Sequence, residues 1–306
     1  MTERVTESAE ADLRPLLFSI AYRMLGTVGD AEDVVQEAFL RLTRTRQEGT
    51  VVENARAFLT TVTTRLAIDQ LRSARARRET YFGPWLPEPL ITAPDQDPAE
   101  VAEMADSLSL SFLVLLETLS PVERAVFLLR EVFDYGYDEI APIVEKSEPN
   151  CRQIFARARK HIDDGKPRFE TDKQRQQELI SRFLAAFKGG DVNGVVELLA
   201  ADVVFYGDGG GKARGLPRPI YGQANVGRLL AAFRPEYAAI GGRVEPIQVN
   251  GQAGTLNFDG HGRLINVFVF DVADGRIQAI RSIINPDKLS HLGFPLSDVA
   301  RPRRGD

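Results

Sequence analysis

The 306-residue chain is poor in the side chains that build disulfide frameworks and metal centres. It contains one cysteine, Cys151, and three histidines that are scattered along the chain. A single cysteine cannot form an intramolecular disulfide, and isolated histidines do not make a histidine-rich metal site. We therefore expect no disulfide, no metal site and no cofactor.

Long apolar runs are also missing. No stretch approaches the roughly 20 apolar residues of a membrane-spanning helix. Residues 1–12 carry acids where a signal peptide has its apolar segment. We expect a cytoplasmic protein without membrane contact. The length and the 43% hydrophobic content predict two or three folded domains.

The net charge of −5 does not by itself indicate a nucleic-acid partner, but the charge is unevenly distributed. Residues 146–160 contain five basic residues and one acid, Glu148. A second basic segment, residues 72–78, contains four arginines. Local clusters of this kind favour phosphate contact over a merely solvated helix surface.

Residues 12–79 have the pattern of amphipathic helices. After Asp30, apolar residues recur at three- and four-residue spacing from Val34 to Leu42, which predicts one buried stripe beside a polar face. A further helix is expected over about 55–75, with Phe58 on its apolar side. Five prolines then mark residues 80–104 as an extended linker. Because this linker holds Tyr81, Phe82 and Trp85, we expect part of it to dock on a surface.

A helix-turn-helix is predicted between residues 105 and 165. Ser120 and Glu123 form a capping box with a proline at the first helical position. A short helix over 138–144 and a longer one over 148–162 flank a tight turn. Asn and Gln side chains can pair with adenine and Arg with guanine, so residues near the start of the second helix suit base contact. On its own this motif is equally typical of a repressor.

From residue 173 the pattern predicts an α+β domain. Two helices, over 174–187 and 193–199, precede short strands with hairpin signals at Asn250-Gly251, Asp259-Gly260 and Asp274-Gly275. These strands predict a curved antiparallel sheet. The segment GDGGGK resembles a phosphate-binding loop, but alanine follows its lysine where that motif requires Ser or Thr, so we reject this interpretation.

Three stretches, DAEDVVQEAFLRL, FLTTVTTRLAIDQLRSARARRE and LETLSPVERAVFLL with YDEIAPIVEKSEPNCRQIFARARKHI, resemble a bacterial sigma factor of the extracytoplasmic-function type. WLPEP, DGGGK and NPDKL are similar to the subgroup with a SnoaL-like C-terminal extension. The resemblance implies a multidomain protein with two all-α sigma domains, the second a helix-turn-helix, followed by a cone-shaped, curved-sheet α+β domain. The expected ranges are 10–79 for sigma domain 2, 80–104 for the linker, 105–167 for sigma domain 4 and 173–295 for the SnoaL-like domain.

The same resemblance implies partners and contact residues. Core RNA polymerase would be bound through the clamp helices of its largest subunit and the flap of its second-largest subunit. The clamp contacts would come from Asp33, Gln36, Glu37, Leu40 and Arg41. The promoter −10 element would be contacted by Asn54, Phe58, Arg65, Asp69, Arg72, Arg75, Arg77 and Arg78. The −35 element would be contacted by Asn150, Arg152, Gln153, Arg157, Arg159 and Lys160.

The C-terminal domain is expected to regulate the sigma factor in cis by contacting the linker. The residues implied are Trp85, Pro87, Asp208, Gly210, Lys212, Asn285, Asp287 and Lys288. A small-molecule ligand of this domain is left open. The alternative is a SnoaL-like enzyme or ligand sensor fused to a helix-turn-helix regulator, for which Tyr206, Asp208, Asp259 and His261 are the available acid–base residues. We expect no catalytic residues and regulation rather than catalysis.

Overall fold

The computed structural model describes residues 12–78, 80–92, 107–165 and 173–298. It divides into two compact units. The helical unit combines Met1–Glu79 with Leu113–Lys166, and the sheet unit combines Thr80–Phe112 with Pro167–Asp306. The proline-rich segment therefore belongs to the same compact unit as the C-terminal domain, although most of that domain lies about 100 residues further along the chain.

Within its described residues, the helical unit begins with α2 (Arg14–Leu25), α3 (Val28–Gln47) and α4 (Ala55–Arg78). They pack on one another through the predicted apolar stripe, in which Val34, Val35 and Leu42 are buried. Helix α3 begins two residues before Asp30, whose carboxylate accepts a 2.6 Å hydrogen bond from the Thr27 hydroxyl. Asp30 therefore lies in the first turn of α3, where the positive end of the helix dipole stabilises its negative charge.

The helix-turn-helix of the sequence prediction is present. Helix α6 (Leu110–Leu116) precedes α7 (Pro121–Glu131), α8 (Tyr137–Val144) and α9 (Glu148–Gly165). The capping box at Ser120 and Glu123 forms as predicted, with both hydrogen bonds made. Glu145, which occupies the position where this turn commonly has glycine, adopts a left-handed conformation with φ of 56° and ends α8. A glycine would hold this conformation without strain, which explains the usual preference.

Contacts within the helical unit join its two sequence segments. The buried Thr60 hydroxyl of α4 lies 3.1 Å from the Tyr135 hydroxyl. The Arg124 side chain, 3% exposed, donates to the Met24 backbone oxygen at 2.6 Å and to Glu117 at 2.8 Å. A guanidinium is costly to bury without such partners. Arg124 therefore ties α7 to the end of α2.

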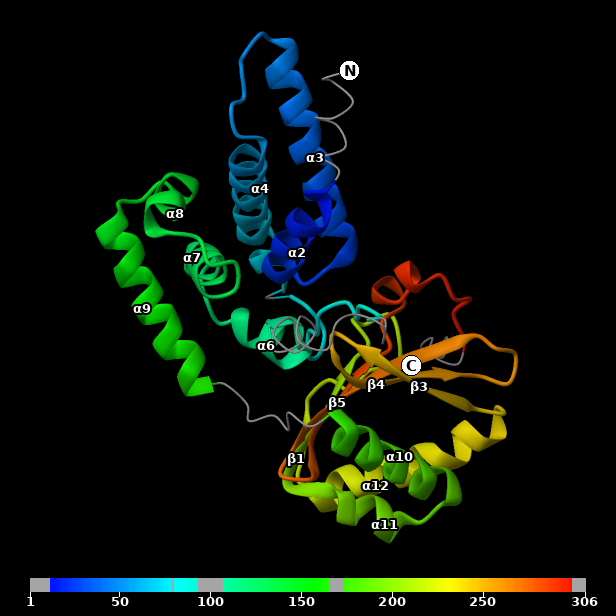
Figure 1. Ribbon diagram of the computed structural model, residues 1–306. Coiled ribbons are helices and arrows are strands. Elements are labelled where there is room, and N and C mark those ends of the chain that lie inside the picture. The colour runs from blue at the N-terminus through cyan, green and yellow to red at the C-terminus, as the bar shows by residue number, and fades with distance from the viewer. Residues whose placement is uncertain (1–11, 79, 93–106, 166–172, 299–306) are drawn as a thin grey trace. The chain divides into compact units, whose positions relative to one another are not determined.

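Among the described residues, the C-terminal part of the sheet unit contains a six-stranded sheet and the helices packed beside it, whose course can be followed in Figure 1. The sheet has the strand order β2-β1-β6-β5-β4-β3. Two short 3-10 turns, Pro286–Lys288 and Ser290–Leu292, follow β6. The elements are α10 (Lys173–Gly189), α11 (Val192–Leu198), β1 (Leu199–Asp208), β2 (Ile220–Tyr221), α12 (Gln223–Ala239), β3 (Arg243–Val249), β4 (Gln252–Phe258), β5 (Leu264–Ala273) and β6 (Arg276–Ile283).

The sheet is mixed, which corrects the expectation of a purely antiparallel one. Strands β1 and β6 pair in parallel, whereas the other neighbours are antiparallel. The expected hairpins do form at Asn250-Gly251 and Asp274-Gly275, where both residues have positive φ. This is the conformation that the tight two-residue turn requires. The third connection is longer and runs from Asp259 to Arg263.

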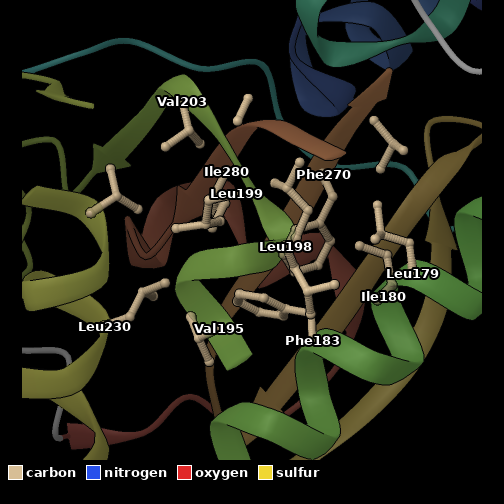
Figure 2. Packing of buried hydrophobic residues seen from close by; sticks show 14 of the residues in the cluster. Leu179, Ile180, Phe183, Val195, Leu198, Leu199, Val203, Leu230, Phe270 and Ile280 are labelled. Carbon is tan, nitrogen blue, oxygen red and sulfur yellow. The ribbon is translucent and has the colours of Figure 1, made fainter. Parts of the chain in front are cut away.

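The core of the sheet unit lies between the helices and one face of the sheet (Figure 2). Phe183 of α10 meets Phe270 of β5 edge to face, with ring centroids 5.5 Å apart. Val195 and Leu198 of α11 and Leu230 of α12 belong to the same cluster. Phe270 and Val272 of β5 with Ile277 and Ile280 of β6 supply the sheet side of this core.

Candidate functional site

Helix α3 presents a polar face with one exposed leucine. Asp33, Gln36 and Arg41 are exposed and Leu40 is 44% exposed, opposite the buried stripe. Glu37 accepts a hydrogen bond from the Arg41 guanidinium at 2.8 Å, and this bond lowers the pKa of Glu37. A leucine surrounded by acids and an amide suits a partner with a basic rim around an apolar contact.

Helix α4 carries the residues predicted to contact the −10 element, and the structure gives several of them internal partners. Asn54 accepts a 3.0 Å hydrogen bond from the Ala57 amide, which caps the helix. Phe58 is half-buried, and the exposed Arg72 donates to Asp69 at 3.1 Å. The side chains of Arg75, Arg77 and Arg78 lie outside the described residues.

Arg65 binds the end of α8. Its guanidinium donates to the backbone oxygens of Pro142 at 2.7 Å and Ile143 at 3.0 Å, and lies 3.2 Å from the Glu145 carboxylate. A cation at this position satisfies helix carbonyls that have no partner within the helix. Arg65 was predicted to contact DNA; its guanidinium has five N–H donors and is 45% exposed, so that contact stays a prediction.

The recognition helix α9 exposes all six side chains predicted to contact the −35 element: Asn150, Arg152, Gln153, Arg157, Arg159 and Lys160. Ile154, Ala158 and Cys151 face inward and are buried. Arg152 pairs with Glu148 at 3.0 Å, and its guanidinium carbon lies 5.0 Å from the Tyr137 ring centroid. These two contacts hold the Arg152 side chain at the start of the helix. Burial raises the pKa of the Cys151 thiol, which disfavours the reactive thiolate form.

The three sequence stretches WLPEP, DGGGK and NPDKL converge in the sheet unit on the carboxylate of Asp208. This side chain is fully buried at the end of β1. Its Oδ1 accepts from the Tyr81 hydroxyl at 2.6 Å, and its Oδ2 accepts from the Leu86 amide at 2.8 Å and from Lys288 Nζ at 2.7 Å. One carboxylate therefore holds two points of the linker and pairs with a cation from the C-terminal 3-10 turn.

Lys288 completes the group of residues that hold the linker, which we call the linker site and which also includes Asp208, Tyr81 and Leu86. Lys288 is 5% exposed. Its ammonium donates to the Leu86 backbone oxygen and lies 4.4 Å from the Trp85 ring centroid and 4.9 Å from that of Tyr81. Cation–π contacts of this kind strengthen when the cation is removed from water. Pro87 is buried beside Leu86. Burial, together with the Asp208 charge, raises the pKa of Tyr81, so its hydroxyl stays a donor.

Gly210, Asn285, Lys212 and Asp287 surround this core. Asn285 Nδ2 donates to the Tyr81 hydroxyl at 2.9 Å, and its Oδ1 accepts from the Asp287 amide. Gly210 has a φ of 58°, and a Cβ there would lie 2.3 Å from Asn285 Nδ2. Only glycine fits both the backbone and the space. Lys212 and Asp287 form an exposed ion pair.

The linker is fixed at a second place, which the sequence did not reveal. Leu90 and Asn250 exchange hydrogen bonds of 2.8 Å, and the Thr92 amide donates to the Gln248 oxygen at 3.1 Å. Ile91 thereby pairs with Val249 in an antiparallel bridge. His291 Nε2 lies 2.8 Å from the Pro89 oxygen. Asn250 could be interpreted from sequence only as a turn residue, since its second role depends on a segment 160 residues away.

The start of α6 is also bound within this unit. The Leu110 amide donates to Gln252 Oε1 at 2.8 Å, and the Ser111 hydroxyl lies 3.3 Å from Asp271, which pairs with the buried Arg281. These polar groups lie on strands that the sequence predicted through their hairpin signals. No signal in the sequence distinguished them from ordinary core-facing positions.

A cavity of about 170 Å³ opens inside the sheet unit, between α12 and the sheet. Five aromatic side chains line it together with Asn257, Asn266 and Ser282. Among the described residues lining it there is no Asp or His. Asp208 is instead bound to the linker, Asp259 to Ser297 and Arg263, and His261 is exposed. Tyr206 lies under the Arg281 guanidinium.

The described residues contain neither a cluster of metal ligands nor a membrane-spanning helix. No cluster of His, Cys, Asp or Glu among them could hold a metal ion. None of the helices that the structure describes is long and apolar enough to cross a bilayer.

Three family models match the chain in order: Sigma-70 region 2 over residues 11–77, Sigma-70 region 4 over 109–162 and a SnoaL-like domain over 180–280. The chain is thus built as a sigma factor with a SnoaL-like extension.

Among curated proteins, the chain is 39% identical over 295 residues to the ECF RNA polymerase sigma factor SigJ of Mycobacterium tuberculosis, covering 94% of this chain and 93% of SigJ. It is 30% identical over 281 residues to the probable sigma factor SigI of the same species, covering 91% and 93%. The crystal structure of SigJ superposes with a TM-score of 0.74 at 36% identity, covering 95% of this chain and all of that one. The chain belongs to the extracytoplasmic-function (ECF) sigma factor family.

Proposed function

We propose that this sigma factor binds core RNA polymerase through the polar face of α3 and directs it to promoters through α4 and α9. The observation that carries the proposal is the match to an ECF sigma factor over nearly the whole chain, in which the predicted contact residues of α3 and α9 lie on exposed faces. The proposal includes a cytoplasmic location, where the polymerase and its DNA are found.

We further propose that the SnoaL-like domain regulates the sigma factor through the linker and does not catalyse a reaction. Asp208 is one of the acid–base residues on which the enzyme alternative depends. Its carboxylate is already bound to Tyr81, Leu86 and Lys288. A general base must be free to reach a substrate proton. The linker site uses this carboxylate for holding the chain that joins the two sigma regions, which favours a regulatory role.

Binding to core RNA polymerase tests the first proposal. The double variant Gln36→Ala plus Glu37→Lys changes the α3 face. The chain offers a matched control, because Gln177 and Glu178 form the same exposed dipeptide on α10. Gln177→Ala plus Glu178→Lys makes the same chemical change at another place. We expect at least a tenfold loss of polymerase affinity for the α3 variant and wild-type affinity for the control.

An equal loss in both variants would mean that charge alone matters, and no loss in either would exclude α3 as the docking face. The helix-turn-helix alternative, a stand-alone repressor, predicts tight binding to duplex DNA without polymerase. Measuring DNA affinity with and without core polymerase separates the two, since the sigma factor proposal expects promoter-specific binding only in the presence of the polymerase.

A further inference from the structure

The cavity of the SnoaL-like domain is the size of a small ring compound. Its volume of about 170 Å³ is close to the ~150 Å³ that suffices for a dry apolar cavity to hold benzene. The aromatic walls are Phe187, Phe205, Phe233, Tyr237 and Phe268. Aromatic walls favour a flat or compact apolar ligand that stacks against them or meets their edges.

One wall of the cavity carries a row of neutral polar groups. Asn257 Nδ2 donates to Asn266 Oδ1 at 2.7 Å, and Asn266 Nδ2 donates to Ser282 Oγ at 3.3 Å. An amide has two N–H donors and a hydroxyl has one. Within the described part of the chain, the second N–H of Asn266 and the hydroxyl proton of Ser282 have no acceptor, so both remain available to a ligand oxygen.

We infer a third donor from Tyr237, whose side chain lines the cavity. Its hydroxyl oxygen is buried and, among the residues that the structure describes, has no hydrogen-bond partner. A buried hydroxyl without a partner costs free energy, which a ligand acceptor would recover. Burial raises the pKa of Tyr237 to about 12, so the phenol is protonated at neutral pH and can donate.

The charged residues at the cavity are paired with each other. Arg214 lies 3.6 Å from Glu236 of α12, and both side chains are partly exposed. A charged ligand entering the aromatic interior would lose its hydration, and this exposed pair keeps its charges in water and not among the aromatic walls. The cavity therefore selects a neutral ligand with one hydrogen-bond acceptor.

The wall of the cavity is also a support of the linker. Gly215 and Leu216 line the cavity, and the Leu216 backbone oxygen lies 2.9 Å from the position that a Cβ on Gly83 of the linker would occupy. Gly207 lines the cavity as well and directly precedes Asp208, the carboxylate that holds the linker. A ligand that displaces Gly215 and Leu216, or the end of β1, acts on the linker without touching it.

We propose that the cavity binds a neutral compound of one or two rings carrying a carbonyl or hydroxyl acceptor, and that its occupancy changes how firmly the SnoaL-like domain holds the linker. The second half rests on the proposed function, because it assigns a signal to the linker contact. The first half stands on the cavity alone.

Calorimetric titration of the full chain with 1-indanone tests the ligand class. The matched probes are indane, which has the same rings without the carbonyl, and indane-1-carboxylate, which is charged. We expect 1-indanone to bind about tenfold more tightly than indane and the carboxylate not to bind. Equal affinities for 1-indanone and indane would overturn the role of the polar wall, and absence of 1-indanone binding would overturn the site.

Tyr237→Phe and Ser282→Ala locate the binding. Each removes one donor and leaves the cavity shape, so each should weaken 1-indanone binding about fivefold and leave indane unchanged. Ile265→Phe fills the cavity and should abolish binding of both. Because Tyr237→Phe removes only a hydroxyl without a partner, we expect this variant to fold. Unchanged 1-indanone affinity in all three variants would place the binding elsewhere and overturn the proposal.

Hydrogen–deuterium exchange of residues 80–92, with and without saturating 1-indanone, tests the coupling. We expect a severalfold change in exchange rate that is absent in Ile265→Phe. Tight binding without any change would overturn the coupling. Polymerase affinity of the same samples keeps the two proposals apart: lost 1-indanone binding with normal polymerase binding sinks only this inference, whereas lost polymerase binding sinks the proposed function.

Discussion

The recognition helix and the linker site use charged residues in opposite ways. On α9, the cations are exposed and their pairs, such as Arg159 with Asp163 at 3.8 Å, lie in water. At the linker site, Asp208 and Lys288 are buried and every contact described for them is within the same unit. Exposed ion pairs are worth little and exchange easily for contacts with a partner. A buried pair is costly to break, so it suits a contact that holds a segment in place.

Asp208→Asn is expected to cause the largest loss of stability, because its pair with Lys288 is buried whereas the pairs on α9 are exposed. The substitution leaves the Lys288 ammonium buried without its counter-charge and removes an acceptor from the linker. Breaking a buried pair on one side costs about 3–5 kcal/mol. Trp85 is the only tryptophan and belongs to the sheet unit, so its fluorescence during urea unfolding reports the stability of that unit.

The matched control is Asp287→Asn, which breaks the exposed pair with Lys212 close by. Exposed pairs contribute about 0–1 kcal/mol, so this variant should unfold near the wild-type urea concentration. If the two variants lose equal stability, burial does not distinguish the two pairs.

Gly210→Ala should have the next largest effect. The new Cβ meets Asn285 Nδ2 and the Tyr81 hydroxyl in a left-handed backbone conformation. Gly262→Ala is the control, since Gly262 has a φ of 75° but nothing within 4 Å of a Cβ. The left-handed conformation alone costs about 1–2 kcal/mol, and Gly210→Ala should lose more than that. Equal losses measured by urea unfolding would show that the Asn285–Tyr81 contact does not depend on this glycine.

Within the recognition helix, Gln153→Ala and Arg157→Ala should change DNA binding in different ways. A bidentate base contact is worth about 1–3 kcal/mol, so loss of Gln153 should relax the preference at one −35 base pair. Loss of Arg157 should weaken binding to all sequences and lower the salt dependence by about one phosphate contact. Promoter affinity of the reconstituted polymerase, measured on a set of −35 variants at several salt concentrations, checks both. Identical effects of the two substitutions would contradict the assignment.

The smallest effect concerns pH. Although burial alone would raise the pKa of Asp259, hydrogen bonds from Ser297, Arg263 and the His261 amide lower it from 3.8 to about 2. A depressed pKa in the folded state adds stability above the unfolded value, and this stability is lost as the pH falls from about 4 to 2. The melting temperature of Asp259→Asn should lie below that of the wild type at pH 7 and approach it at pH 2. A gap that does not shrink would contradict this.

Local signals in the sequence predicted local structure well. The capping box at Ser120 and the turns at Asn250 and Asp274 are confirmed because each depends on a few neighbouring residues. The parallel pairing of β1 with β6 was missed, since it joins strands about 75 residues apart and leaves no periodic signal.

The linker site shows the same limit. Resemblance indicated that WLPEP, DGGGK and NPDKL act together, and the structure brings them together around Asp208. The sequence did not indicate which atoms of these stretches pair, nor that Arg65 binds the end of α8. Such pairings depend on three-dimensional geometry that spacing along the chain does not encode. The contacts predicted for Asp33, Gln36 and the recognition helix involve other molecules and stay predictions.

The central claim is that the SnoaL-like domain controls a sigma factor by holding its linker. Run-off transcription with core RNA polymerase tests it most directly, using the wild type, Asp208→Asn and Asp287→Asn at equal occupancy of the polymerase. The account predicts that Asp208→Asn changes the yield of promoter-specific transcript severalfold, while Asp287→Asn matches the wild type. The same yield from all three proteins would contradict it.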